Sequence, residues 1–154
     1  RDDREDRTVF GMIDMPALDE RWAGDGRTCR FNGRTASVSG CRSLSQAQVY
    51  TSSPDIFAAD EWAAFERVSR RAAFRRFGGD CYLYGLLASG HCDLVIEASL
   101  KPFDFMALMP IVEGAGGHIS DWDGNPLTPN SDGRVVAAAS QDLLREALEA
   151  MQPQ

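Results

Sequence analysis

Long hydrophobic runs are missing from this sequence. No apolar stretch approaches the roughly 18 residues that a membrane-spanning helix needs, and the first residues carry no signal-peptide pattern. Neither secretion nor a membrane partner is therefore expected, and we predict a cytoplasmic protein.

Positive charge is scarce. Lys and Arg number 16 against 23 Asp and Glu, so the formal net charge is −7. Nucleic-acid backbones are held mainly by Lys and Arg, which argues against a nucleic-acid partner. An acidic protein that binds an anionic substrate must supply positive charge locally, from a metal ion or from a helix N-terminus.

Disulfide and zinc patterns are absent as well. The cysteines contain no CxxC pair, and a chain of 154 residues needs no disulfide framework, so we expect reduced thiols. His91 and His118 lack zinc-type spacing, which favours structural or exposed histidines. Residues 121–125 superficially resemble a calcium loop, but the glycine comes too early for an EF-hand, so a turn is the better interpretation. The four cysteines are Cys29, Cys41, Cys81 and Cys92.

The start of the chain is unusual. Arg1 stands in place of Met, and the charged run 1–7 leads directly into the strand-like segment 9–13. We expect that the sequence starts within a longer protein, with removal of an initiator Met as the alternative. A sheet edge near residue 8 would then favour pairing with another chain.

The composition is that of a globular protein. Hydrophobic residues make up 44% and charged residues 25%, and the length suits one domain or one domain plus part of another. Residues 8–40 read as strands and turns, with tight-turn signals at Asp25-Gly26 and Asn32-Gly33. We therefore assign residues 1–42 to the end of an antiparallel sheet domain and residues 43–154 to an α/β domain.

Strands and helices alternate after residue 45. Strands are expected near residues 47–52, 73–77, 93–98, 118–121 and 134–140. Helices are expected over residues 60–72, 81–89, 102–114 and 141–151, with Asp80 and Ser140 as N-caps of the second and the last. Pro110 should kink the third helix, because it removes a backbone hydrogen bond. The alternation predicts an α/β fold with a mostly parallel sheet and helices on both faces.

A single carboxylate opens the otherwise apolar segment 105–112. Asp104 follows Pro102, which suits the first position of a helix. Buried without a partner, this carboxylate would be costly, so it needs a hydrogen-bonding partner or a hard cation such as Mg²⁺. From residue chemistry alone, electrostatic stabilisation of the helix N-terminus is an equally good interpretation.

The run 103–117, Phe-Asp-Phe-Met-Ala-Leu-Met-Pro-Ile-Val-Glu-Gly-Ala-Gly-Gly, resembles the C-terminal signature of the inositol monophosphatase superfamily. In that signature an aromatic-Asp pair opens a buried helix that ends in Gly-Gly. The Asp is a metal ligand, so the resemblance gives Asp104 this role, although Phe103 replaces the usual Trp. The stretches 76–85 and 100–104 resemble histidinol-phosphate phosphatases more closely. The likeness runs from residue 9 to the last helix and implies the C-terminal half of a layered α/β sandwich.

The resemblance also assigns a substrate pocket. Glu97, at the end of a strand, matches a position that holds a polar group of the substrate, with an exposed strand-end charge as the alternative. The loop that follows residue 51 matches a loop that approaches the substrate in the superfamily, but an ordinary surface turn would have the same composition. Five further residues, from a helix start and from that loop, are predicted to contact the substrate: Gly79, Asp80, Cys81, Ser52 and Ser53.

The implied activity is Mg²⁺-dependent hydrolysis of a phosphate monoester by an activated water, with histidinol phosphate of histidine biosynthesis as the substrate. Most metal ligands of the superfamily come from a Glu-Glu segment and an Asp-Pro-(Ile/Leu)-Asp-Gly-Thr motif, and neither occurs in these 154 residues. We therefore expect this chain alone to bind metal weakly and to be inactive. The alternatives are a phosphatase for inositol phosphates, sugar bisphosphates or nucleotide phosphates, and a non-catalytic fragment.

Partners other than the substrate are expected to be protein chains. The sequence predicts a homodimer or pairing with the missing N-terminal half. A cluster of arginines is expected to form a solvated face, with a subunit contact or a phosphate clamp as the alternative. Its members are Arg67, Arg70, Arg71, Arg75 and Arg76.

Overall fold

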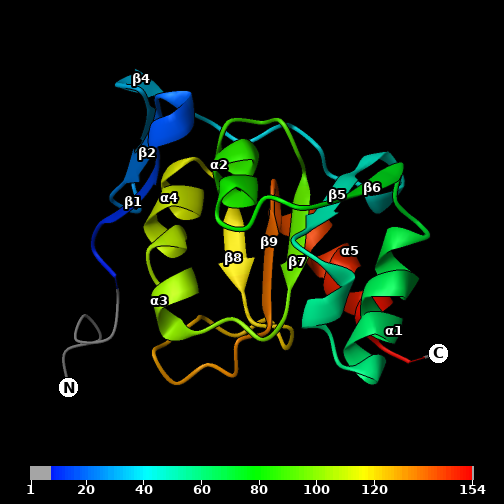
Figure 1. Cartoon of the computed structure of the whole chain (residues 1–154). Coiled ribbons are helices and arrows are strands. Elements are labelled where there is room, and N and C mark those ends of the chain that lie inside the picture. The colour runs from blue at the N-terminus through cyan, green and yellow to red at the C-terminus, as the bar shows by residue number, and fades with distance from the viewer. Residues whose placement is uncertain (1–7, 154) are drawn as a thin grey trace.

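A computed structural model describes residues 8–153 and shows two sheets separated by helices (Figure 1). The first sheet is antiparallel throughout, with strand order β1-β2-β3-β4. Its strands are β1 (Gly11–Met15), β2 (Glu20–Gly24), β3 (Cys29–Phe31) and β4 (Arg34–Thr35). A short 3-10 helix, η1 (Pro16–Leu18), joins β1 to β2. The predicted turns at residues 25–26 and 32–33 lie between strands, as expected.

The second sheet has five strands in the order β6-β5-β7-β9-β8. Its members are β5 (Gln48–Thr51), β6 (Phe74–Phe77), β7 (Leu94–Glu97), β8 (His118–Ser120) and β9 (Val135–Ala138). β5 pairs in parallel with β6 and β7, whereas β9 runs antiparallel to both β7 and β8. The predicted α/β class is confirmed, and the sheet is mixed because β9 alone runs against the other four strands.

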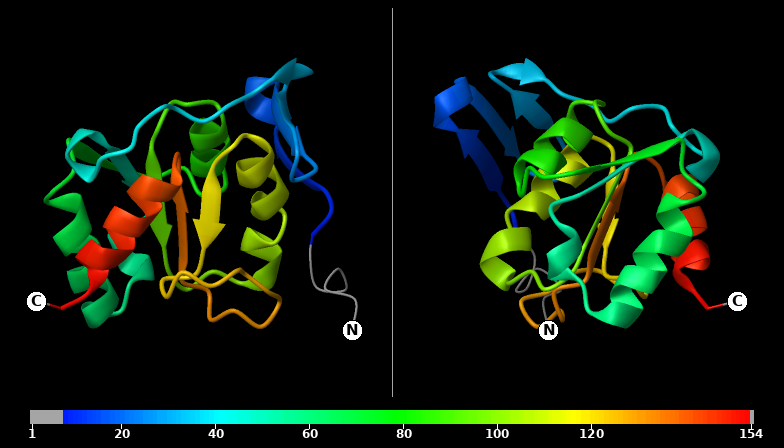
Figure 2. Two further views of the ribbon diagram at one scale, coloured as in Figure 1. Left: turned by 180° about the vertical axis from the view of Figure 1, so that it is seen from behind. Right: turned by 45° about the vertical axis from the view of Figure 1, so that its right-hand side comes forward.

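Helices cover both faces of the five-stranded sheet, which was also predicted. One face packs against α2 (Tyr82–Ala88), α3 (Pro102–Phe105) and α4 (Leu108–Gly114). The other packs against α1 (Ala59–Ser69) and α5 (Gln141–Met151). Two further 3-10 helices, η2 (Leu44–Gln46) and η3 (Pro54–Ile56), flank β5. Figure 2 shows the resulting order of layers: small sheet, helices, large sheet, helices.

The four-stranded sheet approaches α4 at backbone distance. Gly11 and Gly24 are paired in the β1–β2 register, and both face α4. A Cβ atom on Gly24 would lie 2.4 Å from the carbonyl oxygen of Pro110, and one on Gly11 would lie 1.8 Å from that of Ala107. Glycine is therefore required at both positions for this contact between the layers.

The third predicted helix is broken rather than merely kinked. α3 ends at Phe105 and α4 begins at Leu108, so the break lies four residues before Pro110. This placement follows from proline chemistry, because Pro110 cannot donate to the carbonyl of Met106 and its ring crowds that carbonyl. Pro110 itself is buried in the first turn of α4.

Helix capping was predicted correctly at one position and wrongly at another. Ser140 caps α5, because its hydroxyl accepts a hydrogen bond from the Leu143 N–H at 3.2 Å. The prediction that Asp80 caps α2 is wrong: α2 begins at Tyr82, and its N-cap, Cys81, makes no side-chain cap. Asp80 instead adopts a left-handed backbone with φ of 46°.

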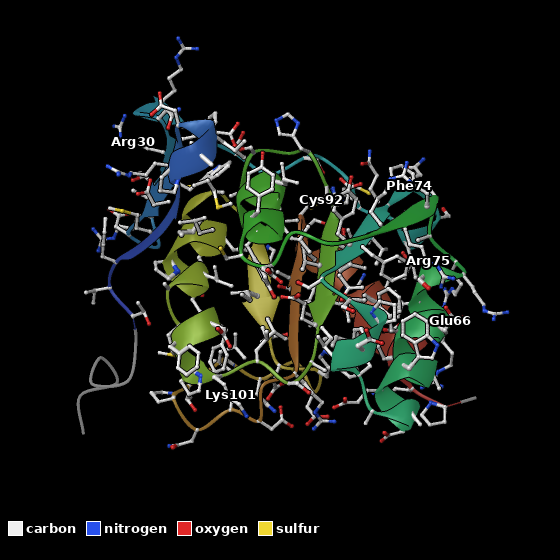
Figure 3. All side chains as sticks on the ribbon, in the orientation of Figure 1. Arg30, Glu66, Phe74, Arg75, Cys92 and Lys101 are labelled. Carbon is white, nitrogen blue, oxygen red and sulfur yellow. The ribbon has the colours of Figure 1, made fainter. Side chains whose placement is uncertain are left out.

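Four of the five arginines of the cluster, all except Arg67, form a solvated face, as expected. Arg67 is half-buried and donates to the carbonyl of Met151 at 3.1 Å. Glu66 of α1 binds Arg70 and Arg75, and Arg71 lies 3.5 Å from Glu146. Figure 3 shows Glu66 and Arg75 close together. The side chains of Arg70 and Arg71 are 77% and 50% exposed. These arginines are thus paired with carboxylates on the surface, and a subunit contact or a phosphate clamp at this face stays a prediction.

Three further expectations bear on the described residues. Asp121 accepts hydrogen bonds from the N–H groups of Asp123 and Asn125, so residues 121–125 form a turn after β8, as predicted. All four cysteines are free thiols. Over residues 8–153, no helix combines the length and the apolar character needed to cross a bilayer.

The charged run 1–7 lies outside the described residues, and the division into two domains at residue 42 stays a prediction.

Candidate active site

A cavity of about 530 Å³ opens where the two sheets and the middle helical layer meet. Its walls come from β1, the loop after β5, the start of α2, the end of β7, and α3 with α4. Carboxylates dominate its polar lining, which comprises Asp14, Ser52, Asp80, Tyr84, Glu97 and Asp104. The apolar wall includes Ile13, Ile56, Leu100, Phe103 and Leu108.

The topology of the large sheet explains why these residues meet. β5 and β7 are neighbouring parallel strands, so their carboxyl ends lie at the same edge of the sheet. Ser52 directly follows β5, and Glu97 is the last residue of β7. Ligands in open α/β sheets commonly bind at this edge, and the sequence had placed Glu97 there.

Glu97 is the most tightly held polar side chain of the cavity. It is 2% exposed, and both of its carboxylate oxygens accept hydrogen bonds. Oε1 accepts from the backbone N–H of Ser52 at 3.2 Å and from the Ser52 hydroxyl, while Oε2 accepts from the Tyr84 hydroxyl at 2.9 Å. Burial raises the pKa of Glu97, and these hydrogen bonds oppose the rise by stabilising the ionised form. The alternative of an exposed strand-end charge is therefore wrong.

Asp80 reaches the cavity because of its unusual backbone. Gly78, Gly79 and Asp80 all have positive φ, at 97°, 123° and 46°. This left-handed turn carries the chain from β6 into α2 and presents the Asp80 side chain to the cavity rather than to the helix N-terminus. Non-glycine residues hold such conformations at a cost, often at functional sites.

Cys81 lines the cavity next to Asp80. Burial is the main cause that raises the pKa of its thiol, and the neighbouring carboxylate of Asp80 adds to the effect. The raised pKa favours the neutral thiol, which is a weaker nucleophile than the thiolate.

Asp104 stands at the mouth of the cavity in the first turn of α3. Its Oδ2 accepts the backbone N–H of Lys101 at 2.8 Å, and the residue is exposed. The geometry is compatible with both interpretations of Asp104, stabilisation of the helix N-terminus and metal binding. One carboxylate oxygen accepts from the helix start, and the residue also lines the cavity.

The described residues do not complete a metal site. Over residues 8–153, no group of three or more His, Cys, Asp and Glu side chains is arranged to hold a metal ion. Mg²⁺ requires near-octahedral oxygen coordination and usually takes one or two carboxylates together with waters and phosphate oxygens. Among the described residues, Asp104 would supply one such carboxylate.

Two predicted contact residues lie away from the cavity lining. The hydroxyl of Ser53 accepts from the Asp55 N–H at 3.2 Å and caps η3. Gly79 belongs to the left-handed turn, where a Cβ atom would lie 2.7 Å from Leu83. Substrate contacts of these two residues stay predictions.

Tyr84 and Asp14 were not predicted, although both line the cavity. Tyr84 is fully buried in an apolar helix, where a tyrosine hydroxyl needs a partner, and this requirement was a usable signal. Asp14 lies on β1 and forms a bidentate ion pair with Arg21 of β2. The Nε and Nη2 atoms of Arg21 each lie 3.0 Å from one carboxylate oxygen of Asp14. Nothing in the local sequence connects β1 to a cavity formed mainly by residues 52–108.

The fold is that of a layered α/β protein, because two sheets alternate with two helical layers. The carboxylate-lined cavity at the ends of parallel strands lies where such proteins bind small molecules. The model of the inositol monophosphatase family matches residues 4–153. The chain belongs to this family.

Individual relatives agree with this assignment. The chain is 44% identical over 154 residues to a chloroplastic bifunctional phosphatase, IMPL2, of Arabidopsis thaliana, covering 95% of this chain and 44% of that protein. It is 33% identical to a histidinol-phosphatase of Streptomyces coelicolor, covering 91% and 54%. A solved inositol monophosphatase from Zymomonas mobilis superposes with a TM-score of 0.93 at 44% identity, covering 96% and 58%. The chain thus spans about half the length of these relatives.

Proposed function

We propose that this chain provides the substrate pocket of a phosphatase that hydrolyses a small phosphate monoester, with histidinol phosphate as the preferred substrate. The observation that carries the proposal is the buried carboxylate of Glu97, fixed by three donors at the end of a cavity of about 530 Å³. A fixed anion of this kind suits a substrate that carries hydrogen-bond donors or a positive charge. The relatives named histidinol-phosphatase support the same substrate.

Two carboxylates of the cavity would receive the organic part of the substrate. Histidinol phosphate carries an ammonium group and an imidazole N–H, both of which can donate to Glu97 and Asp80, while its hydroxyl oxygen is esterified by the phosphate. The phosphate would lie toward Asp104, where a magnesium ion with further ligands would neutralise phosphate charge and polarise the bond that breaks. Cys81 and Leu100 would line the site beside these groups.

This chain by itself is proposed to be inactive. Asp104 is the metal ligand that the family signature supplies within residues 8–153, and the described residues hold no complete metal cluster. The remaining carboxylates would come from the portion of the relatives that this chain does not match. Pairing with such a portion would bring the two parts together, and a homodimer of this chain is a separate proposal.

Phosphate release tests this proposal directly. The chain is assayed with Mg²⁺ and histidinol phosphate, alone and mixed with the portion of the Arabidopsis relative that it does not match. We expect no release from the chain alone, release from the mixture, and loss of that release in the control variant Asp104→Asn. A mixture that stays inactive, while the intact Arabidopsis protein is active in the same assay, would contradict the proposal.

An inositol phosphate is the second candidate substrate. The observation that favours it is the match to the inositol monophosphatase from Zymomonas mobilis. Inositol carries hydroxyl groups and no positive charge, so it would gain less from the two neighbouring carboxylates of Glu97 and Asp80. A panel with histidinol phosphate, inositol phosphate, a sugar bisphosphate and a nucleotide phosphate separates the candidates by their relative kcat/KM.

A further inference from the structure

We propose that Tyr84 is a positioning residue, whose buried hydroxyl fixes Glu97 as an ionised acceptor that is open only to a donor group of the substrate. The inference rests on the proposed function for the identity of the substrate. The role of Tyr84 itself rests on its burial and on its hydrogen bond to Glu97.

The hydroxyl of Tyr84 donates its hydrogen bond to Glu97. The residue is fully buried on α2, and its hydroxyl donates to Oε2 of Glu97 at 2.9 Å across 13 residues of sequence. A phenol has one proton to give, and an ionised carboxylate can only accept, so the direction of this bond is fixed. Burial also raises the pKa of the Tyr84 hydroxyl, which keeps that proton in place.

Counting acceptor positions shows what remains for a ligand. An ionised carboxylate offers about four lone-pair positions. Three lone-pair positions of Glu97 accept hydrogen bonds: two from the backbone N–H and the hydroxyl of Ser52, and one from the hydroxyl of Tyr84. The remaining lone-pair position lies on Oε2, the same oxygen that accepts from Tyr84. Glu97 lines the cavity, so a ligand there can reach this position. Only a donor, such as an ammonium or a hydroxyl group, can fill it.

Tyr84 therefore matters to substrate choice because it opposes protonation of Glu97. A protonated Glu97 would itself need an acceptor and would lose its attraction for an ammonium group. Besides Tyr84, the titratable groups Asp80 and Cys81 interact electrostatically with Glu97. Cys92 and Asp104 interact electrostatically with Tyr84. The negative charge of Asp80 favours protonation of Glu97, so the hydrogen bond from Tyr84 acts against both burial and this neighbour.

The chain contains a matched control on the same helix. Tyr82 also donates its hydroxyl to a glutamate, Oε2 of Glu20, at 2.8 Å. Glu20 belongs to β2 and lies outside the cavity lining. Replacing either tyrosine by phenylalanine removes one hydroxyl and keeps the ring.

The test follows the side-chain carboxyl carbon of Glu97 by NMR during a pH titration, with its signal assigned by its loss in Glu97→Gln. We expect Glu97 to titrate at higher pH in Tyr84→Phe than in the wild type, and at an unchanged pH in Tyr82→Phe. L-histidinol should bind Tyr84→Phe about tenfold more weakly, because a hydrogen bond to a charged group is lost. Incorporation of fluorotyrosine, a stronger donor, should shift the Glu97 titration to lower pH, and this arm does not depend on the folding of a variant.

The outcomes separate the two ideas. If Glu97 titrates at the same pH in Tyr84→Phe, in the fluorotyrosine protein and in the wild type, the positioning role is wrong. If Glu97 shifts as expected but L-histidinol does not bind the wild-type chain, the role of Tyr84 is supported and the proposed substrate is rejected.

Discussion

Two buried carboxylates stand at opposite ends of the central strand β7. Asp93 comes just before the strand, and Glu97 is its last residue. They are 6% and 2% exposed, and each accepts from a serine hydroxyl and a backbone N–H. Asp93 binds Ser39 and the N–H of Gln48, as Glu97 binds both groups of Ser52.

The difference between the two carboxylates lies in what surrounds them. Glu97 lines a cavity of about 530 Å³ that Asp80 also lines, whereas Asp93 is not part of the lining of that cavity. The carbonyl of Asp93 instead accepts the N–H of Ala139, which ties β7 to the residue after β9. Burial and hydrogen bonding alone therefore do not distinguish the carboxylate proposed to bind substrate from a structural one, whereas the cavity beside Glu97 does.

The largest expected effect on stability belongs to Asp93. Replacement by alanine leaves the buried N–H of Gln48 without its acceptor, which should lower the free energy of unfolding by about 1–3 kcal/mol. Urea unfolding measures this loss. Affinity for L-histidinol should stay within about twofold of the wild type, since the cavity lies at the other end of β7. A large loss of affinity in a folded Asp93→Ala variant would break the comparison.

The largest expected effect on binding belongs to Glu97. Glu97→Gln keeps the shape of the side chain but removes its charge, so affinity for L-histidinol should fall at least about tenfold. Stability should change by less than in Asp93→Ala, because the variant no longer buries a charge. Calorimetric titration gives the affinity, and urea unfolding gives the stability. Retained affinity would show that Glu97 does not contact the ligand.

The dependence of stability on pH should distinguish Glu97 from a surface glutamate. Burial raises the pKa of Glu97 above its ordinary value of 4.5, so the folded state holds this proton more tightly than the unfolded state. Its stabilising contribution is complete below that ordinary pKa and is lost as pH rises through the folded-state pKa. The stability of the wild type relative to Glu97→Gln should therefore fall as pH rises.

Glu66 provides the control of opposite sign. The hydrogen bond from Arg75 lowers the pKa of Glu66, so its contribution is present above the ordinary pKa and is lost as pH falls. Stability relative to Glu66→Gln should therefore rise with pH over the same acidic range. Equal slopes for the two variants would contradict the assigned environments.

The smallest effects are expected from the two serines. Ser39→Ala and Ser52→Ala each remove one hydroxyl donor, and each should cost about 1 kcal/mol or less of stability. Only Ser52→Ala should move the titration of Glu97, toward higher pH, as followed by NMR of the carboxyl carbon. A shift of that titration in Ser39→Ala would mean that the two ends of β7 are coupled.

Much of the fold could be predicted because its signals are local. α5 begins and ends at the predicted residues, and its Ser140 cap is confirmed. The strands of the large sheet were predicted to within a few residues from apolar runs between turns. The Asp80 cap failed because two glycines before it allow a left-handed turn, which removes Asp80 from the capping position.

The site could be predicted only in part, because its geometry depends on contacts distant in sequence. Glu97 and Asp80 were predicted from a family resemblance, and the structure places both at the cavity. Tyr84 and Asp14 were missed because their roles require the folding of α2 and β1 around the end of β7. Local chemistry likewise does not show that Ser53 binds within its own turn while Ser52 reaches Glu97.

The most direct test of a donor-selective pocket is an NMR comparison of L-histidinol and myo-inositol added to the isotope-labelled chain with Mg²⁺ present. We predict that L-histidinol shifts the amide signals of Ser52, Asp80 and Glu97 at lower concentration than myo-inositol does, and leaves those of Asp93 and Ser39 unchanged. Shifts at the Asp93 end of β7, or no preference between the two compounds, would contradict the account.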